Sequence, residues 1–342
     1  MADGPSISAL NSPPSGQVSS SAPVDLRPLT TSELIDRGFS LYRTHFTGFL
    51  LLALLSQIAP LICQVLATIL KLNPSQNEFV NHPAIAFIKI GVLLFISLIA
   101  QVIVFCFEVV IAFYIADAYL GKIPSVIDSL RRFSTCVGSS IWTCILNRIL
   151  IGLTIIFPFL ATLAISLYIA FYPPQDFITI LLIGGAAVLL GVASLVPVLV
   201  VFMRLMVTVP AVALEGLSGW KAVKRSSTLV RYDPGLGILY WGEMRLSFLL
   251  LPLFVIEMLL LSITSLPLIL HQVNDILQHG SSGQTSAPPD SIMILSQVLM
   301  FLTGSLILPL YSIAMTLFYY DVRIRREGFD LEFMAKNLGE QK

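Results

Sequence analysis

Long apolar runs alternate along this chain with shorter stretches that are polar or amphipathic. A helix that crosses the hydrocarbon core of a bilayer needs about 20 mostly apolar residues. The pattern therefore predicts an all-α polytopic membrane protein with six transmembrane helices. The six segments that meet this requirement are residues 46–70, 90–116, 149–171, 177–203, 246–270 and 291–320.

The segment before the first apolar run has the spacing of an amphipathic helix. Ile35, Phe39 and Tyr42 recur at helical intervals and share one face, while charged residues occupy the other face. Thr30 and Glu33 have the spacing of a capping box, which predicts that the helix begins near Thr30. An amphipathic helix with cations on its polar face is expected to lie in the headgroup region of the membrane.

Similar basic stretches precede the third and fifth apolar runs, at residues 123–138 and 218–235. A shift of 188 residues aligns Arg37 with Arg225, and it also aligns Arg43 with Arg231. This spacing suggests three repeats, each consisting of an amphipathic cytoplasmic interfacial helix followed by a two-span hairpin. Any chain that alternates basic loops with helix pairs would show a similar pattern, so both interpretations stay open.

The two ends of the chain differ in character from the apolar runs. Residues 1–28 are rich in Ser, Pro and Gly and poor in apolar residues, which predicts a disordered tail without a cleavable signal peptide. The membrane domain is expected to cover residues 29–338, followed by a short C-terminal tail at 339–342. Tyr319 and Tyr320 suit the membrane interface, and the charged residues from Asp321 onward are expected to continue the sixth helix into water.

Composition and the placement of cations bear on the orientation of the domain. Hydrophobic residues make up 56% of the chain, charged residues make up 12% and the net charge is zero, which fits lipid and argues against nucleic acid as a partner. Sixteen Lys and Arg residues fall on one side of the six-span arrangement, whereas the other side holds only Lys71 and Lys89. The loop at residues 271–290 contains neither Lys nor Arg. The positive-inside rule then places both termini in the cytoplasm of a multi-pass protein.

The basic stretches provide candidate contacts for anionic lipid headgroups. Each cation near a negatively charged membrane surface contributes about 1 kcal/mol of attraction. The candidates are Arg37, Arg43, Arg131, Arg132, Lys224, Arg225 and Arg231.

Ionisable residues in or beside the apolar runs form a candidate intramembrane polar site. A charge at the middle of a transmembrane helix costs roughly 2.5 to 3.5 kcal/mol, so each such residue needs a partner or a function. Glu257 lies near the middle of the fifth run, either as a protonatable site in a transport or lipid-headgroup pathway, or as a hydrogen-bonded carboxylic acid between helices. The others lie near the cytoplasmic ends of the runs and are expected to form ion pairs between helices or a polar vestibule. They are Glu108, Arg148, Arg204, Glu243 and Arg245.

Motifs for enzymatic chemistry are missing from the sequence. There is no phosphate-binding glycine loop, HExxH motif, GxSxG motif or nucleotide fingerprint. The four cysteines have no CxxC spacing, and the four histidines show no clustering typical of metal ligands. We therefore expect neither a cofactor nor catalysis.

Three stretches resemble a bacterial family of uncharacterised integral membrane proteins: ELIDRGFSLYRTHF at 33–46, VPAVALEGLSGWKAVKRSSTLVR at 209–231 and YYDVRIRREGFDLE at 319–332. That family is similar to the membrane domain attached to some glycerophosphoryl diester phosphodiesterases. The resemblance implies a bacterial inner-membrane location and a helical domain of about six spans. It transfers no catalytic residue, because those enzymes work through a separate soluble barrel that these residues do not contain.

Two hypotheses for function follow. The first is a non-enzymatic membrane domain that organises lipids or partner proteins, membrane-bound or cytoplasmic, at its basic cytoplasmic face. The alternative is a transporter of a small or lipid-like solute that uses the intramembrane acidic and basic residues. A polar cavity that reaches Glu257 would distinguish between them.

Overall fold

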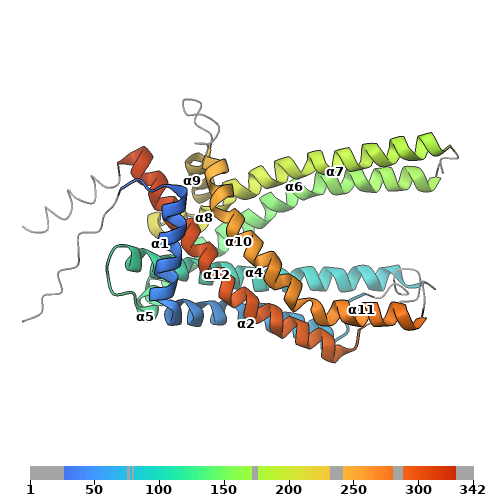
Figure 1. Cartoon of the computed structure of the whole chain (residues 1–342), viewed down its shortest axis with the longest axis horizontal. Coiled ribbons are helices and arrows are strands. Elements are labelled where there is room, and N and C mark those ends of the chain that lie inside the picture. Colours follow the sequence, from blue (N-terminus) through green and yellow to red (C-terminus); the bar gives the residue numbers. More distant parts are fainter. Residues whose placement is uncertain are drawn as a thin grey trace, which may run out of the picture.

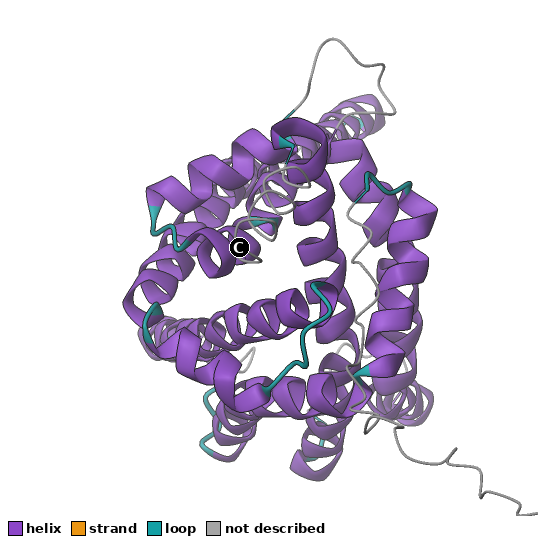
Figure 2. Cartoon of the chain, turned by 90° about the vertical axis from the view of Figure 1, so that its left-hand side faces the viewer, coloured by secondary structure: helices purple, strands orange, loops and turns teal. Residues whose placement is uncertain are grey.

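The computed structural model describes residues 27–74, 78, 81–171, 176–231, 242–279 and 288–328. Within these ranges the regular elements are helices, and no strand is present (Figure 2). The predicted tail lies outside the described residues except for Arg27 and Pro28, as do residues 172–175. The last residues of the chain, from 329 onward, also lie outside.

Six helices are long and apolar enough to cross a membrane, which confirms the predicted multi-pass architecture. α4 has 37 residues and α12 has 38 residues. At about 1.5 Å per residue both exceed the roughly 30 Å of hydrocarbon, so part of each helix lies beyond the bilayer core. The six are α2 (Phe46–Ile69), α4 (Pro83–Tyr119), α6 (Val137–Phe171), α7 (Phe177–Met206), α10 (Gly242–Thr264) and α12 (Asp290–Glu327).

Four short helices gather at one end of the long ones, on the left in Figure 1. Three of them are the predicted amphipathic helices. The fourth, α8, follows directly after α7 in the sequence. We call this end, with its many Lys and Arg residues, the basic end. The four are α1 (Thr31–Thr44), α5 (Val126–Ser134), α8 (Thr208–Glu215) and α9 (Trp220–Val230). An amphipathic helix thus precedes a pair of spans three times, as the repeat hypothesis expects.

The predicted capping box at the start of α1 is confirmed. The Thr30 side chain accepts a hydrogen bond from the Glu33 amide at 3.3 Å, and the Glu33 carboxylate accepts one from the Thr30 amide at 2.7 Å. Hydrogen bonds from Thr30, assisted by Arg27, lower the pKa of the exposed Glu33 carboxyl to about 2. The carboxylate is therefore ionised at any physiological pH, and it can cap the start of α1 over that whole range.

One predicted boundary is wrong. The fifth span was expected to run over residues 246–270 and to be followed by a loop at 271–290, but α10 ends at Thr264 and α11 (Leu266–His279) follows at once. Pro267 has no amide hydrogen with which to continue α10, whereas the second position of a new helix tolerates proline. The chain therefore forms two helices, α10 and α11, where the uniform apolar run predicted a single helix.

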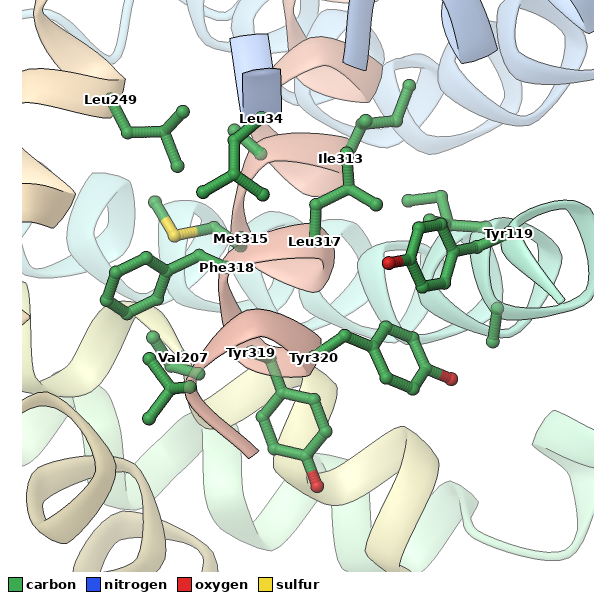
Figure 3. Close-up of a cluster of buried hydrophobic side chains, with 14 of the residues drawn as sticks. Leu34, Tyr119, Val207, Leu249, Ile313, Met315, Leu317, Phe318, Tyr319 and Tyr320 are labelled. Atoms are coloured by element: carbon green, nitrogen blue, oxygen red, sulfur yellow. The ribbon is translucent and has the colours of Figure 1, made fainter. Parts of the chain in front are cut away.

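The core of the molecule surrounds the second half of α12. Figure 3 shows Ile313, Leu317 and Phe318 on this helix among side chains of α1, α4 and α10. Tyr319 and Tyr320 are also buried, with 0% and 3% of their surface exposed. Three short helices of the basic end, α1, α8 and α9, pack against α12.

Candidate functional site

A cavity of about 610 Å³ opens between the last turns of α7 and the middle of α10. Its floor is formed by α12, with contributions from α4 and α8. Four residues that line it are also exposed on the outer surface of the bundle: Leu199 and Phe202 of α7, and Leu251 and Phe254 of α10. Because these residues belong to membrane-spanning helices, the mouth of the cavity faces the lipid. We call this space the α7–α10 cavity.

The walls of the α7–α10 cavity are mostly apolar, with a few polar groups at intermediate depth. Two of the predicted intramembrane residues, Glu108 of α4 and Glu257 of α10, line it together. Four hydroxyl groups complete its polar surface, and they belong to Ser247, Tyr311, Ser312 and Thr316. Small-molecule sites in proteins typically combine apolar walls with a small number of polar groups in this way.

Glu257 is held by a hydrogen bond between helices. The Tyr311 hydroxyl on α12 donates to the Glu257 carboxyl on α10 at 2.7 Å, and both residues face the cavity. This contact matches the sequence-based alternative of a hydrogen-bonded carboxyl between helices. The cavity beside it reaches Glu257, as the other alternative, a site in a transport or lipid-headgroup pathway, requires, although its walls are mostly apolar rather than polar. The two roles are therefore compatible in this structure.

Glu108 faces the cavity without a hydrogen bond from any side chain that the structure describes. Arg148 of α6 is near enough to act on it electrostatically, but its guanidinium donates instead to the Gln101 amide oxygen at 2.7 Å. Neighbouring Asn147 is buried, and its side-chain oxygen has no hydrogen-bond partner. Of the two carboxyl groups in the cavity, Glu108 is thus the one left open to a ligand.

Most hydroxyl donors in the cavity are already used within the protein. Ser247 donates to the backbone oxygen of Glu243 at 2.8 Å, and Thr316 donates to that of Ser312 at 2.8 Å. Tyr311 donates to Glu257, as described above. The polar surface that remains consists largely of hydrogen-bond acceptors, including two carboxyl groups.

Arg204 of α7 and Glu243 of α10 form an ion pair beside the cavity. Arg204 Nε lies 2.7 Å from Glu243 Oε1, so the expected pairing between helices is confirmed for these two. The backbone oxygen of Arg204 also accepts a hydrogen bond from Ser226 of α9 at 2.5 Å. The two side chains neutralise each other's charge, and the pair links α7 to α10 next to α9.

Arg245 belongs to a different network, centred on Asp321 of α12. Asp321 is 1% exposed and accepts hydrogen bonds from Arg245 at 2.9 Å, from Arg325 at 3.0 Å and from the Leu29 amide at 2.8 Å. Both arginines donate in addition to the Leu29 backbone oxygen, at 3.1 and 2.6 Å. This network fastens the segment before α1 to α10 and α12.

The expectation that Asp321 extends into water is therefore wrong. Its neighbours Tyr319, Tyr320, Val322 and Ile324 are buried as well. These uncharged residues between the arginines were the signal that could have indicated burial. Two ion pairs with a spacing of four residues form on this helix, between Asp321 and Arg325 and between Arg323 and Glu327.

A second network, centred on Glu215 at the end of α8, was not anticipated from the sequence. Arg225 of α9 donates to both Glu215 oxygens at 2.8 to 2.9 Å, and the Tyr319 hydroxyl donates to Oε1. Arg225 also donates a hydrogen bond to Glu327 at 2.8 Å. Its hydrogen bonds to Glu327, which has the larger effect, and to Glu215 raise the pKa of Arg225 above its ordinary value. The network joins α8, α9 and α12, and α8 contributes Val209 and Pro210 to the cavity lining.

The seven candidate lipid contacts divide into two groups. Arg225 is engaged with Glu215 and Glu327, Arg132 forms a two-pronged ion pair with the buried Asp117, and Arg37 lies over the Tyr119 ring at 5.0 Å. These three have partners within the chain. Arg43, Arg131, Lys224 and Arg231 are exposed at the basic end.

The described part of the chain holds no group of three or more His, Cys, Asp or Glu side chains that could bind a metal ion. Comparison with known proteins adds no further guide: the chain matches no protein-family model, no curated protein and no solved structure.

Proposed function

We propose that this protein is a non-enzymatic membrane domain that takes up a lipid-like solute from the bilayer into the α7–α10 cavity. The observation that carries the proposal is a cavity that faces the lipid and contains two carboxyl groups, Glu108 and Glu257. This observation favours the transport hypothesis over a purely organising role at the membrane surface.

The size and lining of the cavity support this choice. Its volume of about 610 Å³ falls within the range of about 300 to 1,000 Å³ that is common for ligand pockets. The exposed Leu199, Phe202, Leu251 and Phe254 at its mouth suit an acyl or alkyl chain, which could enter sideways without leaving the hydrocarbon. Intramembrane carboxyl groups are costly, and they are commonly found where they serve a substrate pathway.

Blocking the cavity with a large side chain tests the proposal. Ser312→Trp on α12 fills the cavity, whereas Ser262→Trp on the exposed part of α10 leaves it open. We expect native mass spectrometry with added hexadecylphosphocholine to show one saturable adduct on the parent protein and on the Ser262→Trp control. The Ser312→Trp variant should bind about tenfold more weakly, the equivalent of about 1.4 kcal/mol.

Circular dichroism and thermal unfolding check that both variants fold. Ser247→Phe, on the opposite wall, provides a second block if Ser312→Trp is unstable. Equal binding by folded blocked and control proteins would contradict the proposal.

We also propose that the basic end lies in the cytoplasm of a bacterium, with the spans in the inner membrane. The distribution of Lys and Arg supports this orientation, and the resemblance to the membrane domain of glycerophosphoryl diester phosphodiesterases supports the location. The exposed Arg43, Arg131, Lys224 and Arg231 would then contact anionic headgroups or a partner protein.

The orientation predicts that a single cysteine introduced at Ser282, in a background without the native cysteines, reacts with a membrane-impermeant maleimide from outside the cell. A cysteine at Asp36 on α1 should react only after the membrane is permeabilised. The reverse pattern would overturn the orientation but would leave the cavity proposal intact.

A further inference from the structure

The α7–α10 cavity offers a ligand two carboxyl groups and no cationic side chain among the lining residues that the structure describes. Glu108 and Glu257 are the acidic residues in that lining. The nearest cations are directed elsewhere: Arg148 donates to Gln101, and Arg204 is paired with Glu243. Neither arginine lines the cavity.

The hydrogen-bonding groups show the same bias. Ser247, Thr316 and Tyr311 direct their hydroxyl hydrogens to acceptors within the protein. A phosphate or carboxylate group in the cavity would find few donors and would face two carboxyl groups. An ammonium group would instead find acceptors already in place.

From these observations we infer that the α7–α10 cavity binds amphiphiles with a cationic, amine-type headgroup, placed between Glu108 and Glu257, with the chain directed toward the lipid-facing mouth. This inference rests on the proposed function and specifies its ligand. Glu108 is the more open of the two, because Glu257 already accepts a hydrogen bond from Tyr311. Tyr311 orients the Glu257 carboxyl.

Four single-chain amphiphiles with the same C16 chain and different headgroups provide the test. Hexadecylamine and hexadecyltrimethylammonium are cationic, hexadecylphosphocholine is zwitterionic, and hexadecyl sulfate is anionic. Native mass spectrometry of the full-length protein in a neutral detergent gives the affinity of each for a single saturable site. We expect the two cationic probes to bind about tenfold more tightly than the anionic one, as expected for one contact with a charged group.

Neutralising the carboxyl groups should remove this preference without abolishing binding. We expect Glu108→Gln and Glu257→Gln each to lower the cation-to-anion ratio several-fold, and the double variant to lower it about tenfold. Asp290→Asn is the matched control, because it removes a carboxylate from the same membrane domain, at the exposed start of α12 and outside the cavity lining.

The outcomes separate the two proposals. If all four probes bind the same site equally, or if the anionic probe binds best, the inference about charge is overturned while the cavity remains a binding site. If no probe forms a saturable adduct that Ser312→Trp weakens, the proposed function fails as well. A preference for cations that persists in both Gln variants would also overturn the assignment to these two residues.

Discussion

Replacing Asp321 by asparagine is expected to lower the free energy of unfolding by about 3 to 5 kcal/mol, the range observed when one partner of a buried ion pair is removed. The carboxylate is 1% exposed and serves Arg245, Arg325 and the Leu29 amide at once. The isosteric amide keeps the shape of the side chain but leaves the guanidinium groups of the largely buried Arg245 and the more exposed Arg325 without their shared countercharge.

Titration of the protein from neutral detergent into mixed micelles with sodium dodecyl sulfate, followed by circular dichroism, measures this loss. Asp36→Asn on the exposed face of α1 is the control, and it should change stability by no more than about 0.5 kcal/mol. In a double-mutant cycle, adding Arg245→Gln to Asp321→Asn should cost clearly less than Arg245→Gln alone, because the arginine has already lost its partner. Additive losses would show that the network is not coupled.

The second large effect is expected at Glu215. Glu215→Ala should lower the free energy of unfolding by about 2 to 3 kcal/mol, somewhat less than for Asp321, because the 17% exposure of this side chain admits some solvent screening. The change leaves the Tyr319 hydroxyl without its acceptor, and it removes the contact through which Arg225 joins α8 to α9.

The same micelle titration measures this effect, and a lipid-binding measurement extends it. Because α8 contributes Val209 and Pro210 to the cavity, Glu215→Ala should also weaken hexadecylphosphocholine binding, whereas Asp321→Asn should affect binding little in the folded fraction. Tyr319→Phe isolates one hydrogen bond and should cost about 1 kcal/mol. A Glu215→Ala protein as stable as the parent would refute the role assigned to this network.

These two networks show where prediction from the sequence stopped. The six spans follow from the lengths of the apolar runs, and α1, α5 and α9 follow from their amphipathic spacing and caps. Glu108 and Glu257 were recognised as unusual because a charge is costly wherever it falls within such a run. That both line one cavity could not be inferred, because α4 and α10 are separated by more than 100 residues in the chain.

Pairing of charges was harder to predict than their presence. Six ionisable residues were expected at the candidate polar site, yet they separate into the cavity residues, the Arg204–Glu243 pair, the Asp321 network with Arg245, and Arg148 beside Gln101. Asp321 was missed because it lies in a charged stretch that reads as exposed, and Glu215 was missed because α8, the helix that ends with it, was not predicted. Short-range spacing shows which residues share a helix face, but it does not show which helix covers that face.

The sequence by itself determined that this protein lies in a lipid bilayer, how many membrane spans it has and where its amphipathic helices are. These properties depend on local hydrophobicity and local hydrogen bonding, which neighbouring residues largely decide. The tertiary structure alone decided the burial of the end of α12, the partners of the arginines and the existence of the α7–α10 cavity. Each of these depends on contacts between helices that are distant in the chain, and the apolar pattern of a membrane helix carries little information about such contacts because lipid-facing and protein-facing surfaces are both apolar.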